Sequence, residues 1–279
     1  MKEKNIGFIG AGNMASALMQ GMIQSGQFNA GQIRINDRVH SYHPSHPATV
    51  YHIAQLDKQA LLQWADVLIL AVKPQDLFDV LLEIDPLIQD RLLLISIAAG
   101  VDITHIAQSL TSSVPIIRAM PNMSAQVLAS ATALSAHSLV TEEELTFAQS
   151  VFRCVGTVRL VPEEQMDAVT GLSGSGPAYV YTFLKAMIEG GQQAGLSYQD
   201  AASLSLQTLR GAIEMVTITG EDPETLTRRI CSPNGTTLAG LHVLKSRGFE
   251  EHVVEAIKAA THRSQELRQE NHQASPGKD

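Results

Sequence analysis

The chain has 279 residues, a formal net charge of −8, 44% hydrophobic residues and 5% aromatic residues. This length suggests two domains and supports a full hydrophobic core, while the acidic charge and scarce aromatic side chains argue against nucleic acid as a partner. Two cysteines are too few for a disulfide framework, no apolar run is long enough to cross a membrane, and the first residues do not resemble a signal peptide. We therefore expect a cytoplasmic protein that does not bind membranes.

Aliphatic runs typical of buried strands alternate with amphipathic stretches in the first half of the chain. The predicted strands cover residues 6–9, 33–36, 67–72, 92–98, 115–118 and 155–160. The predicted helices cover residues 13–25, 75–88, 103–110 and 140–154. Nearly continuous Val, Ile and Leu strands separated by helices predict a parallel sheet covered on both faces, which is an α/β domain of the Rossmann type.

Residues 38–52 interrupt this alternation where a crossover helix is expected. Two prolines make a long helix improbable there, so we predict an irregular surface loop. The same stretch contains four histidines, at His40, His43, His46 and His52. Because they lie in a proline-containing loop without nearby cysteine, a solvated loop is favoured over a metal site, and we predict no metal.

The pattern changes after about residue 161, where apolar residues follow helical spacing and no strand pattern returns. We predict a Rossmann NAD(P)-binding domain over residues 1–161, an all-helical C-terminal domain over 162–268, and a disordered polar tail over 269–279. Three acidic residues near the boundary, Glu163, Glu164 and Asp167, are interpreted as a solvated face.

A glycine-rich turn follows the first predicted strand and opens the first predicted helix. Its sequence is Gly10-Ala11-Gly12-Asn13-Met14-Ala15. This is the dinucleotide fingerprint in its required context, because one glycine permits the tight turn, the next lets backbone approach a pyrophosphate, and the alanine lets helix and sheet pack closely. A tight turn without a ligand is the simpler alternative, but strand, turn and helix together favour cofactor binding.

The second predicted strand is followed by Asp37 and Arg38. An acid at this position would bind the ribose 2′-hydroxyl of NAD, whereas an arginine would accept the 2′-phosphate of NADP. Since the sequence offers both, it leaves NADPH and NADH open. Lys73 and Pro74 end another strand at the carboxyl edge of the sheet, where open α/β sheets bind ligands.

Two loops rich in glycine and hydroxyl side chains occur in the helical half, at residues 171–179 and 231–237. In the first, Ser175 or Gly176 can cap a following helix that has Pro177 in its first turn. A helix N-terminus with hydroxyl side chains can hold a carboxylate. Helix capping alone explains either loop, but two of them beside a dinucleotide domain favour an anionic substrate.

Five motifs together resemble the pyrroline-5-carboxylate reductase family. They are Gly7 to Ala15, Ala71-Val72-Lys73-Pro74, Arg118-Ala119-Met120-Pro121-Asn122, Gly171 to Tyr179, and Ser232-Pro233-Asn234-Gly235-Thr236-Thr237. The resemblance extends from about residue 5 to about residue 268. The two C-terminal loops are its most diagnostic part, because many dehydrogenases share the glycine-rich turn.

The resemblance implies that NADPH or NADH reduces the cyclic imine 1-pyrroline-5-carboxylate to L-proline, the last step of proline biosynthesis. It implies a Rossmann domain and a helical domain through which two copies form a homodimer, with rings of dimers in some members. The implied cofactor-binding residues are Gly10, Gly12, Asn13, Met14, Ala15, Asp37, Arg38, Ala71, Val72, Lys73, Pro74 and Asn122. The implied substrate-binding residues are Ser175, Ser232, Pro233, Asn234, Gly235 and Thr236, and the implied catalytic residue is Thr237, which would hydrogen-bond the ring nitrogen.

The sequence departs from the family pattern at three places. Asn234 replaces the first glycine of the Ser-Pro-Gly-Gly loop, and asparagine tolerates left-handed backbone, so we expect the turn to survive. Met123-Ser124 replaces the usual Thr-Pro near the nicotinamide, and residues 38–52 differ from the usual crossover.

Other functions remain open from the residues alone. A β-hydroxyacid dehydrogenase would place a catalytic lysine in the long helix after the Rossmann domain, where this chain offers only Lys185, without that family's surrounding pattern. Another imine reductase could share the two-domain plan. A non-catalytic dinucleotide sensor would keep Gly10 and Gly12 without needing residues 232–237, whose presence favours the enzyme.

Overall fold

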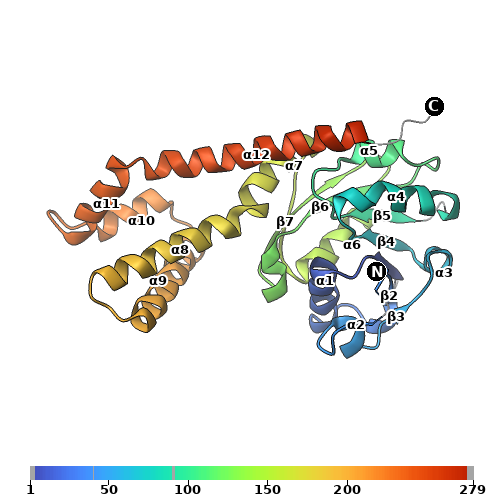
Figure 1. Ribbon diagram of the computed structural model, residues 1–279, viewed down its shortest axis with the longest axis horizontal. Coiled ribbons are helices and arrows are strands. Elements are labelled where there is room, and N and C mark those ends of the chain that lie inside the picture. Colours follow the sequence, from blue (N-terminus) through green and yellow to red (C-terminus); the bar gives the residue numbers. More distant parts are fainter. Residues whose placement is uncertain (1–3, 40, 90–91, 275–279) are drawn as a thin grey trace. The chain divides into compact units, whose positions relative to one another are not determined.

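The computed structural model describes residues 4–39, 41–89 and 92–274, with side chains described as far as Asn271. The chain forms two compact units (Figure 1). The first unit comprises the described residues up to Ser175 together with those from Ala259 onward, and the second comprises Gly176–Lys258. His40 and the last five residues of the predicted tail lie outside the described residues.

The first unit contains an eight-stranded sheet with the order β3-β2-β1-β4-β5-β6-β7-β8. The strands are β1 Ile6–Ile9, β2 Ile33–Asn36, β3 Ala54–Gln55, β4 Val67–Leu70, β5 Leu93–Ser96, β6 Ile116–Met120, β7 Ser130–Ala136 and β8 Gly156–Leu160. Strands β1 to β6 pair in parallel, as predicted, and the strand order reverses between β1 and β4. The predicted Rossmann-type fold class is confirmed.

The sheet is not wholly parallel, and our prediction is wrong at one edge. Strand β7 pairs antiparallel with β6, and β8 pairs parallel with β7. The connection from Met120 to Ser130 contains only one short 3-10 turn, Met123–Val127. A parallel crossover needs a dozen or more residues, so this short connection forces the chain to reverse direction.

Helices cover both faces of the sheet (Figure 1). One face packs against α1 (Asn13–Gln24) and α6 (Glu142–Arg153), and the other packs against α3 (Lys58–Trp64), α4 (Pro74–Ile84) and α5 (Ile103–Gln108). Strands β1, β4 and β5 are buried along their whole length, which explains their continuous aliphatic sequences.

The described residues between 38 and 52 form a loop with only one turn of helix, α2 (Pro47–Val50). The predicted absence of a long helix is confirmed. The loop is not simply solvated, however. The His46 side chain caps α2, and its Nε2 contacts the Ala11 carbonyl.

The second unit consists of helices. Helices α8 (Gly176–Gln193), α9 (Tyr198–Thr219), α10 (Pro223–Ile230) and α11 (Thr236–Ser246) lie within it, followed by the first part of α12 (Phe249–Ala274). Helix α8 packs against α9, and the rings of Phe183 and Phe249 lie 5.7 Å apart. Within Gly176–Lys258, Ala201 and Ser205 are the only buried residues. None of the helices in the described part of the chain has the length and apolar content of a membrane span.

The boundary between units differs from the predicted one at residue 161. The last strand ends at Leu160, but the following helix α7 (Met166–Val169) packs within the first unit. Asp167 is 5% exposed and accepts hydrogen bonds from Ser264 Oγ at 2.8 Å and from Arg268 Nε at 3.1 Å. These bonds tie both α7 and the end of α12 to the first unit.

The same region corrects two further expectations. Glu163 is not part of a solvated face, since its Oε1 lies 2.9 Å from Nη1 of Arg118, whose side chain is 2% exposed. The tail is not disordered from residue 269, since α12 continues to Ala274 and Asn271 Nδ2 donates to the Gly100 carbonyl at 2.9 Å.

Candidate functional site

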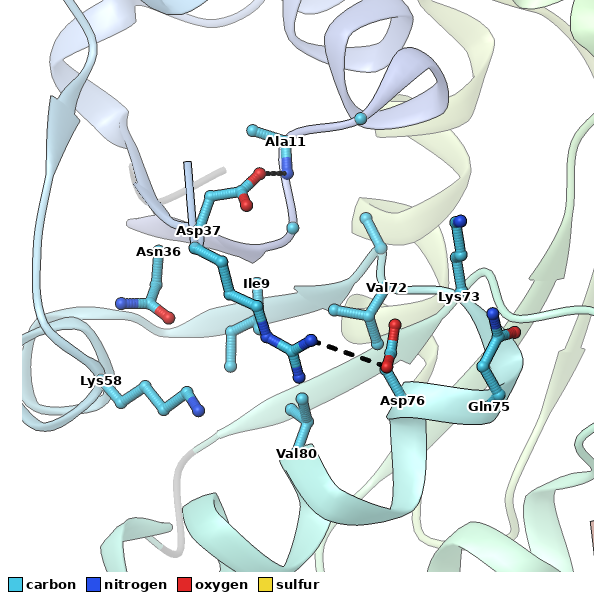
Figure 2. A pocket seen from close by; sticks show the side chains of 14 residues that line it. Ile9, Ala11, Asn36, Asp37, Lys58, Val72, Lys73, Gln75, Asp76 and Val80 are labelled. Carbon is cyan, nitrogen blue, oxygen red and sulfur yellow. Dashed lines mark hydrogen bonds and ion pairs between the residues drawn. The ribbon is translucent and has the colours of Figure 1, made fainter. Parts of the chain in front are cut away.

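A cavity of about 460 Å³ lies at the carboxyl ends of β1, β2 and β4 (Figure 2). Seven of the predicted cofactor residues line it, namely Gly10, Gly12, Asp37, Arg38, Ala71, Val72 and Lys73. Since the strand order reverses between β1 and β4, the cavity lies at the topological switch point, where such sheets bind ligands.

Gly10 is the first residue of the glycine-rich turn and lies close to the backbone of neighbouring segments. Its φ of +92° is in the region that favours glycine, and a Cβ here would meet the Ala71 carbonyl oxygen at 2.7 Å. Its backbone N–H donates to the Asn36 carbonyl at 2.8 Å. The turn is therefore held tightly between the ends of β2 and β4.

Gly12 precedes α1 as its N-cap, and no side chain caps this helix. A Cβ built on Gly12 meets nothing within 4 Å, so open cavity lies beside the backbone. The helix N-terminus provides backbone N–H groups and the positive end of the helix dipole. An uncapped N-terminus beside open space fits the pyrophosphate of a dinucleotide.

Asp37 is directed at the turn rather than away from it (Figure 2). Its Oδ2 accepts from the Ala11 backbone N–H at 2.6 Å, and its Oδ1 accepts from the Val39 N–H at 3.2 Å. The carboxylate therefore fixes the glycine-rich turn, and it retains acceptor capacity for a ribose hydroxyl.

Two cations, Arg38 and Lys58, share one end of the cavity with acidic side chains. Arg38 Nη1 lies 3.7 Å from Oδ1 of Asp76, which is in the first turn of α4, and the Arg38 side chain is 79% exposed. Burial, and secondly the nearby Arg38 cation, lower the pKa of Lys58. Lys58 is also paired with Glu83. This end of the cavity can accept a 2′-phosphate through the cations or a ribose hydroxyl through Asp37.

Sequence reasoning missed Lys58, Gln75 and Asp76, which also line the cavity. The signal for the last two was available, because they directly follow Lys73-Pro74 at the carboxyl edge. Lys58 had no comparable signal, since it depends on how the short strand β3 leads into α3.

Other predicted cofactor residues do not line this cavity, namely Asn13, Met14, Ala15, Pro74 and Asn122. Ala15 is 1% exposed and lies in the core where α1 packs on the sheet. Asn122 is 8% exposed, accepts from the Ser124 N–H at 3.1 Å and donates to the Ser173 carbonyl at 3.0 Å. In this structure Asn122 connects two backbone segments of the first unit.

The loop between α10 and α11 adopts the turn that the sequence requires. Asn234 has a φ of +55°, so asparagine does adopt the left-handed conformation that the family's glycine would take. The Gly235 N–H donates to the Ser232 carbonyl at 3.0 Å, and a Cβ on Gly235 would collide with the Ser232 hydroxyl. The turn thus needs a residue tolerant of positive φ at position 234, and it leaves little room for a side chain at position 235.

Helix α11 begins directly after this turn, with Thr236 and Thr237 as its first two residues. Gly235 is its N-cap and provides no capping side chain. The backbone N–H groups of the first turn and two hydroxyls are thus available beside Ser232, a combination suited to a carboxylate.

The other predicted substrate loop is not a loop. Thr170–Gly174 forms a π-helical turn, and the Ser175 backbone N–H donates to the Thr170 carbonyl at 2.9 Å. Helix α8 does begin at Gly176 with Pro177 in its first turn, as predicted, but it directly follows this π-helical turn, which uses the Ser175 N–H. The glycine at 174 instead allows a close approach to Met120, whose Cε would lie 2.7 Å from a Cβ at that position.

Comparison with known proteins gives the family. Residues 163–267 match the model of pyrroline-5-carboxylate reductase dimerisation, and residues 5–100 match the model described as NADP oxidoreductase coenzyme F420-dependent. Pyrroline-5-carboxylate reductase 1 of Bacillus subtilis is 39% identical over 95% of this chain and 90% of its own length. The Escherichia coli pyrroline-5-carboxylate reductase is 38% identical over 95% of this chain and 98% of its own length. The chain belongs to the pyrroline-5-carboxylate reductase family.

Solved structures of the family agree with this assignment. A pyrroline-5-carboxylate reductase from Coxiella burnetii has a TM-score of 0.89 and 34% identity, with 95% of this chain and 99% of that chain covered. A Plasmodium falciparum pyrroline carboxylate reductase with NADP bound has a TM-score of 0.86 and 29% identity, with 96% and 99% covered. The predicted family resemblance, reductase function and nicotinamide dinucleotide cofactor are confirmed.

Proposed function

We propose that this pyrroline-5-carboxylate reductase family member transfers a hydride from NADPH or NADH to the C=N bond of 1-pyrroline-5-carboxylate and releases L-proline. Family membership and the cavity at the glycine-rich turn support this proposal. The bound dinucleotide supplies the hydride, which adds to the imine carbon, while the ring nitrogen receives a proton and becomes the amine of proline.

The cofactor half of the site would use backbone more than side chains. The uncapped N-terminus of α1 at Gly12 would hold the pyrophosphate, and Asp37, Arg38 and Lys58 would surround the adenosine ribose. We assign two of the predicted residues outside the cavity, Met14 and Asn122, to the nicotinamide half of the cofactor.

The substrate half of the site would lie at the N-terminus of α11. Ser232, Pro233, Asn234 and Gly235 form the turn, and its backbone with Thr236 would hold the substrate carboxylate. We assign Ser175 to the same substrate. The hydroxyl of Thr237 would hydrogen-bond the ring nitrogen and hold the imine in orientation, which is sufficient help because a free imine can take its proton from water.

The assembly would be a homodimer formed through the helical domain over residues 162–268, with a ring of dimers as a larger form. The matching dimerisation family model supports this, as does the near absence of buried residues within Gly176–Lys258. We also propose that the protein works in the cytoplasm, where this biosynthetic step would take place.

The reaction is tested by following loss of reduced nicotinamide absorbance with pyrroline-5-carboxylate and each cofactor separately. We expect oxidation of at least one cofactor and formation of proline in stoichiometric amount. Folded protein that oxidises neither NADPH nor NADH would overturn the proposal. The ratio of the two kcat/KM values also gives the cofactor preference that Asp37 and Arg38 leave open.

The role of Thr237 is tested by replacing it with alanine. Thr237→Ala should lower kcat roughly tenfold to a hundredfold, because the ring nitrogen loses its positioning hydroxyl, while the Kd for NADH stays unchanged. Thr237→Ser keeps a hydroxyl and should recover most of the turnover. Unchanged turnover in Thr237→Ala would remove this residue from the mechanism.

A further inference from the structure

The glycine-rich turn is held from both sides at a single residue, Ala11. Its backbone N–H donates to Asp37 Oδ2 at 2.6 Å, and its carbonyl lies 2.9 Å from Nε2 of His46. Ser16 Oγ lies 2.8 Å from the same nitrogen and donates to the Ala11 carbonyl at 3.2 Å. His46 belongs to the loop at residues 38–52, for whose histidines no function was predicted.

The hydrogen bonds of His46 determine which ring nitrogen carries the proton. Its Nδ1 accepts from the Ala48 backbone N–H at 3.1 Å, as the N-cap of α2. An accepting Nδ1 has no hydrogen of its own, so in the neutral ring the proton is on Nε2. Nε2 is therefore the donor to the Ala11 carbonyl.

The hydrogen bond from His46 Nε2 to the Ala11 carbonyl determines the direction of the Gly12 N–H, which belongs to the same peptide group. The peptide bond between Ala11 and Gly12 is planar and, like all peptide bonds in the described residues, not cis, so its C=O and N–H point in opposite directions. His46 lines a second cavity of about 400 Å³, which Gly12 does not line, whereas Gly12 lines the cofactor cavity. With its carbonyl held toward His46, this peptide directs the Gly12 N–H away from it, toward the cofactor cavity.

We propose that His46 is a positioning residue for the cofactor pyrophosphate, because it holds the Ala11 carbonyl so that the Gly12 N–H faces the phosphate. This inference rests on the proposed dinucleotide binding. The pyrophosphate is common to NADH and NADPH, so His46 acts equally on both cofactors. His46 lies in the loop at residues 38–52, where this chain departs from the family pattern.

Tyr42 packs against His46, one of the two residues that hold Ala11. Its ring stacks on His46 with centroids 4.2 Å apart and an interplanar angle of 13°. Burial, and secondly the charge of Asp37, raise the pKa of Tyr42 to about 12. The Tyr42 ring thus holds the imidazole of His46 in place beside the turn.

The test compares His46→Phe, which keeps the stacking on Tyr42 but removes Nε2, with His46→Gln, which retains an N–H donor of similar reach. Binding is measured without substrate, from the change in nicotinamide fluorescence on addition of NADH or NADPH. We expect His46→Phe to raise both Kd values by the same factor, about tenfold. This is the size expected when the Gly12 N–H no longer forms its hydrogen bond to the charged pyrophosphate. His46→Gln should stay within about threefold of the parent, and kcat at saturating cofactor should change less than about twofold in both variants.

His43 provides the matched control, since it lies in the same loop with an exposed side chain whose Nδ1 contacts Ser45 Oγ. His43→Phe should leave both Kd values unchanged. If His46→Phe does not fold, Ser16→Ala removes the hydroxyl that contacts both Nε2 and the Ala11 carbonyl, and it should raise both Kd values about two- to threefold.

Folded His46→Phe with unchanged Kd values would overturn the proposal, and so would a loss confined to NADPH, which would place His46 at the 2′-phosphate instead. Failure of the underlying dinucleotide assignment gives a different result, since the parent protein itself would then bind neither cofactor.

Discussion

The two compact units differ in what holds them together. The first unit has two hydrophobic cores, one on each face of its sheet, and strands that are buried along their length. Within the second unit only Ala201 and Ser205 are buried, while large apolar side chains such as Ile213 and Ile218 are 62% and 81% exposed. Exposed apolar surface on this scale marks a surface that binds another protein.

The contrast shows where each unit obtains its stability. Burial of apolar area is the main favourable term in folding, and the first unit obtains it within the chain. The second unit must obtain it from a partner, and the match to a dimerisation family model indicates a second copy. The dinucleotide cavity lies in the unit that is complete by itself, whereas the proposed carboxylate site lies in the unit that needs a partner.

The largest expected effect comes from placing a charge on the exposed apolar surface of the second unit. Ile213→Asp should weaken dimerisation by roughly a hundredfold or more, because an unpaired carboxylate would be buried at the interface. Light scattering coupled to size-exclusion chromatography measures this, and activity should fall with the dimer fraction. The matched control is Leu82→Asp in α4 of the first unit, where the side chain is 53% exposed.

Leu82→Asp should leave the mass unchanged. If Ile213→Asp is as dimeric and as active as the parent protein, the second unit does not depend on a partner through α9, and the comparison fails.

Much of the first unit could be predicted from sequence because its central strands β1, β4 and β5 are fully buried. Continuous aliphatic runs identified six of the eight strands. Strand β7 was missed since its sequence, Ser130–Ala136, consists mainly of small and polar residues, and β3 was missed since it has only two residues. Both depend on pairing with neighbouring strands, which no local pattern reveals.

The candidate sites were predictable where function depends on backbone. Glycine-rich turns are recognisable in a sequence, so Gly10, Gly12 and the turn at Asn234 could be predicted from the spacing of their residues. His46 could not, because which side chain of an irregular loop folds inward depends on tertiary contacts. One signal was present, since a proline directly after His46 is typical of a first helical residue preceded by an N-cap.

An effect of intermediate size is expected in the reactivity of the two cysteines, one of which lies in each unit. Cys154 is 7% exposed, and burial raises the pKa of its thiol, although a hydrogen bond from Ser25 acts in the opposite direction. Cys231 is partly exposed beside the turn at Ser232. A thiol with a raised pKa has less thiolate at a given pH, and a buried one must also be exposed by local opening.

We therefore expect an aromatic disulfide reagent to modify Cys154 more slowly than Cys231, by roughly an order of magnitude or more. The rate for Cys154 should continue to rise with pH above the range in which an ordinary thiol has fully ionised. Cys154→Ser and Cys231→Ser assign the two phases. Equal rates for the two thiols would show that burial in the first unit does not protect Cys154.

The smallest expected effect tests whether backbone conformation shapes the proposed carboxylate site. Asn234 has a φ of +55°, where glycine is free of strain, asparagine is tolerated, and alanine is disfavoured by about 1–2 kcal/mol. Asn234→Ala should therefore raise the KM for pyrroline-5-carboxylate about fivefold to tenfold, while Asn234→Gly stays within about twofold. The Kd for NADH should not change in either variant, because the dinucleotide cavity lies in the other unit. If alanine and glycine at this position give the same KM, the left-handed turn is not what presents the N-terminus of α11, and the Thr236 and Thr237 hydroxyls would have to bind the substrate without it.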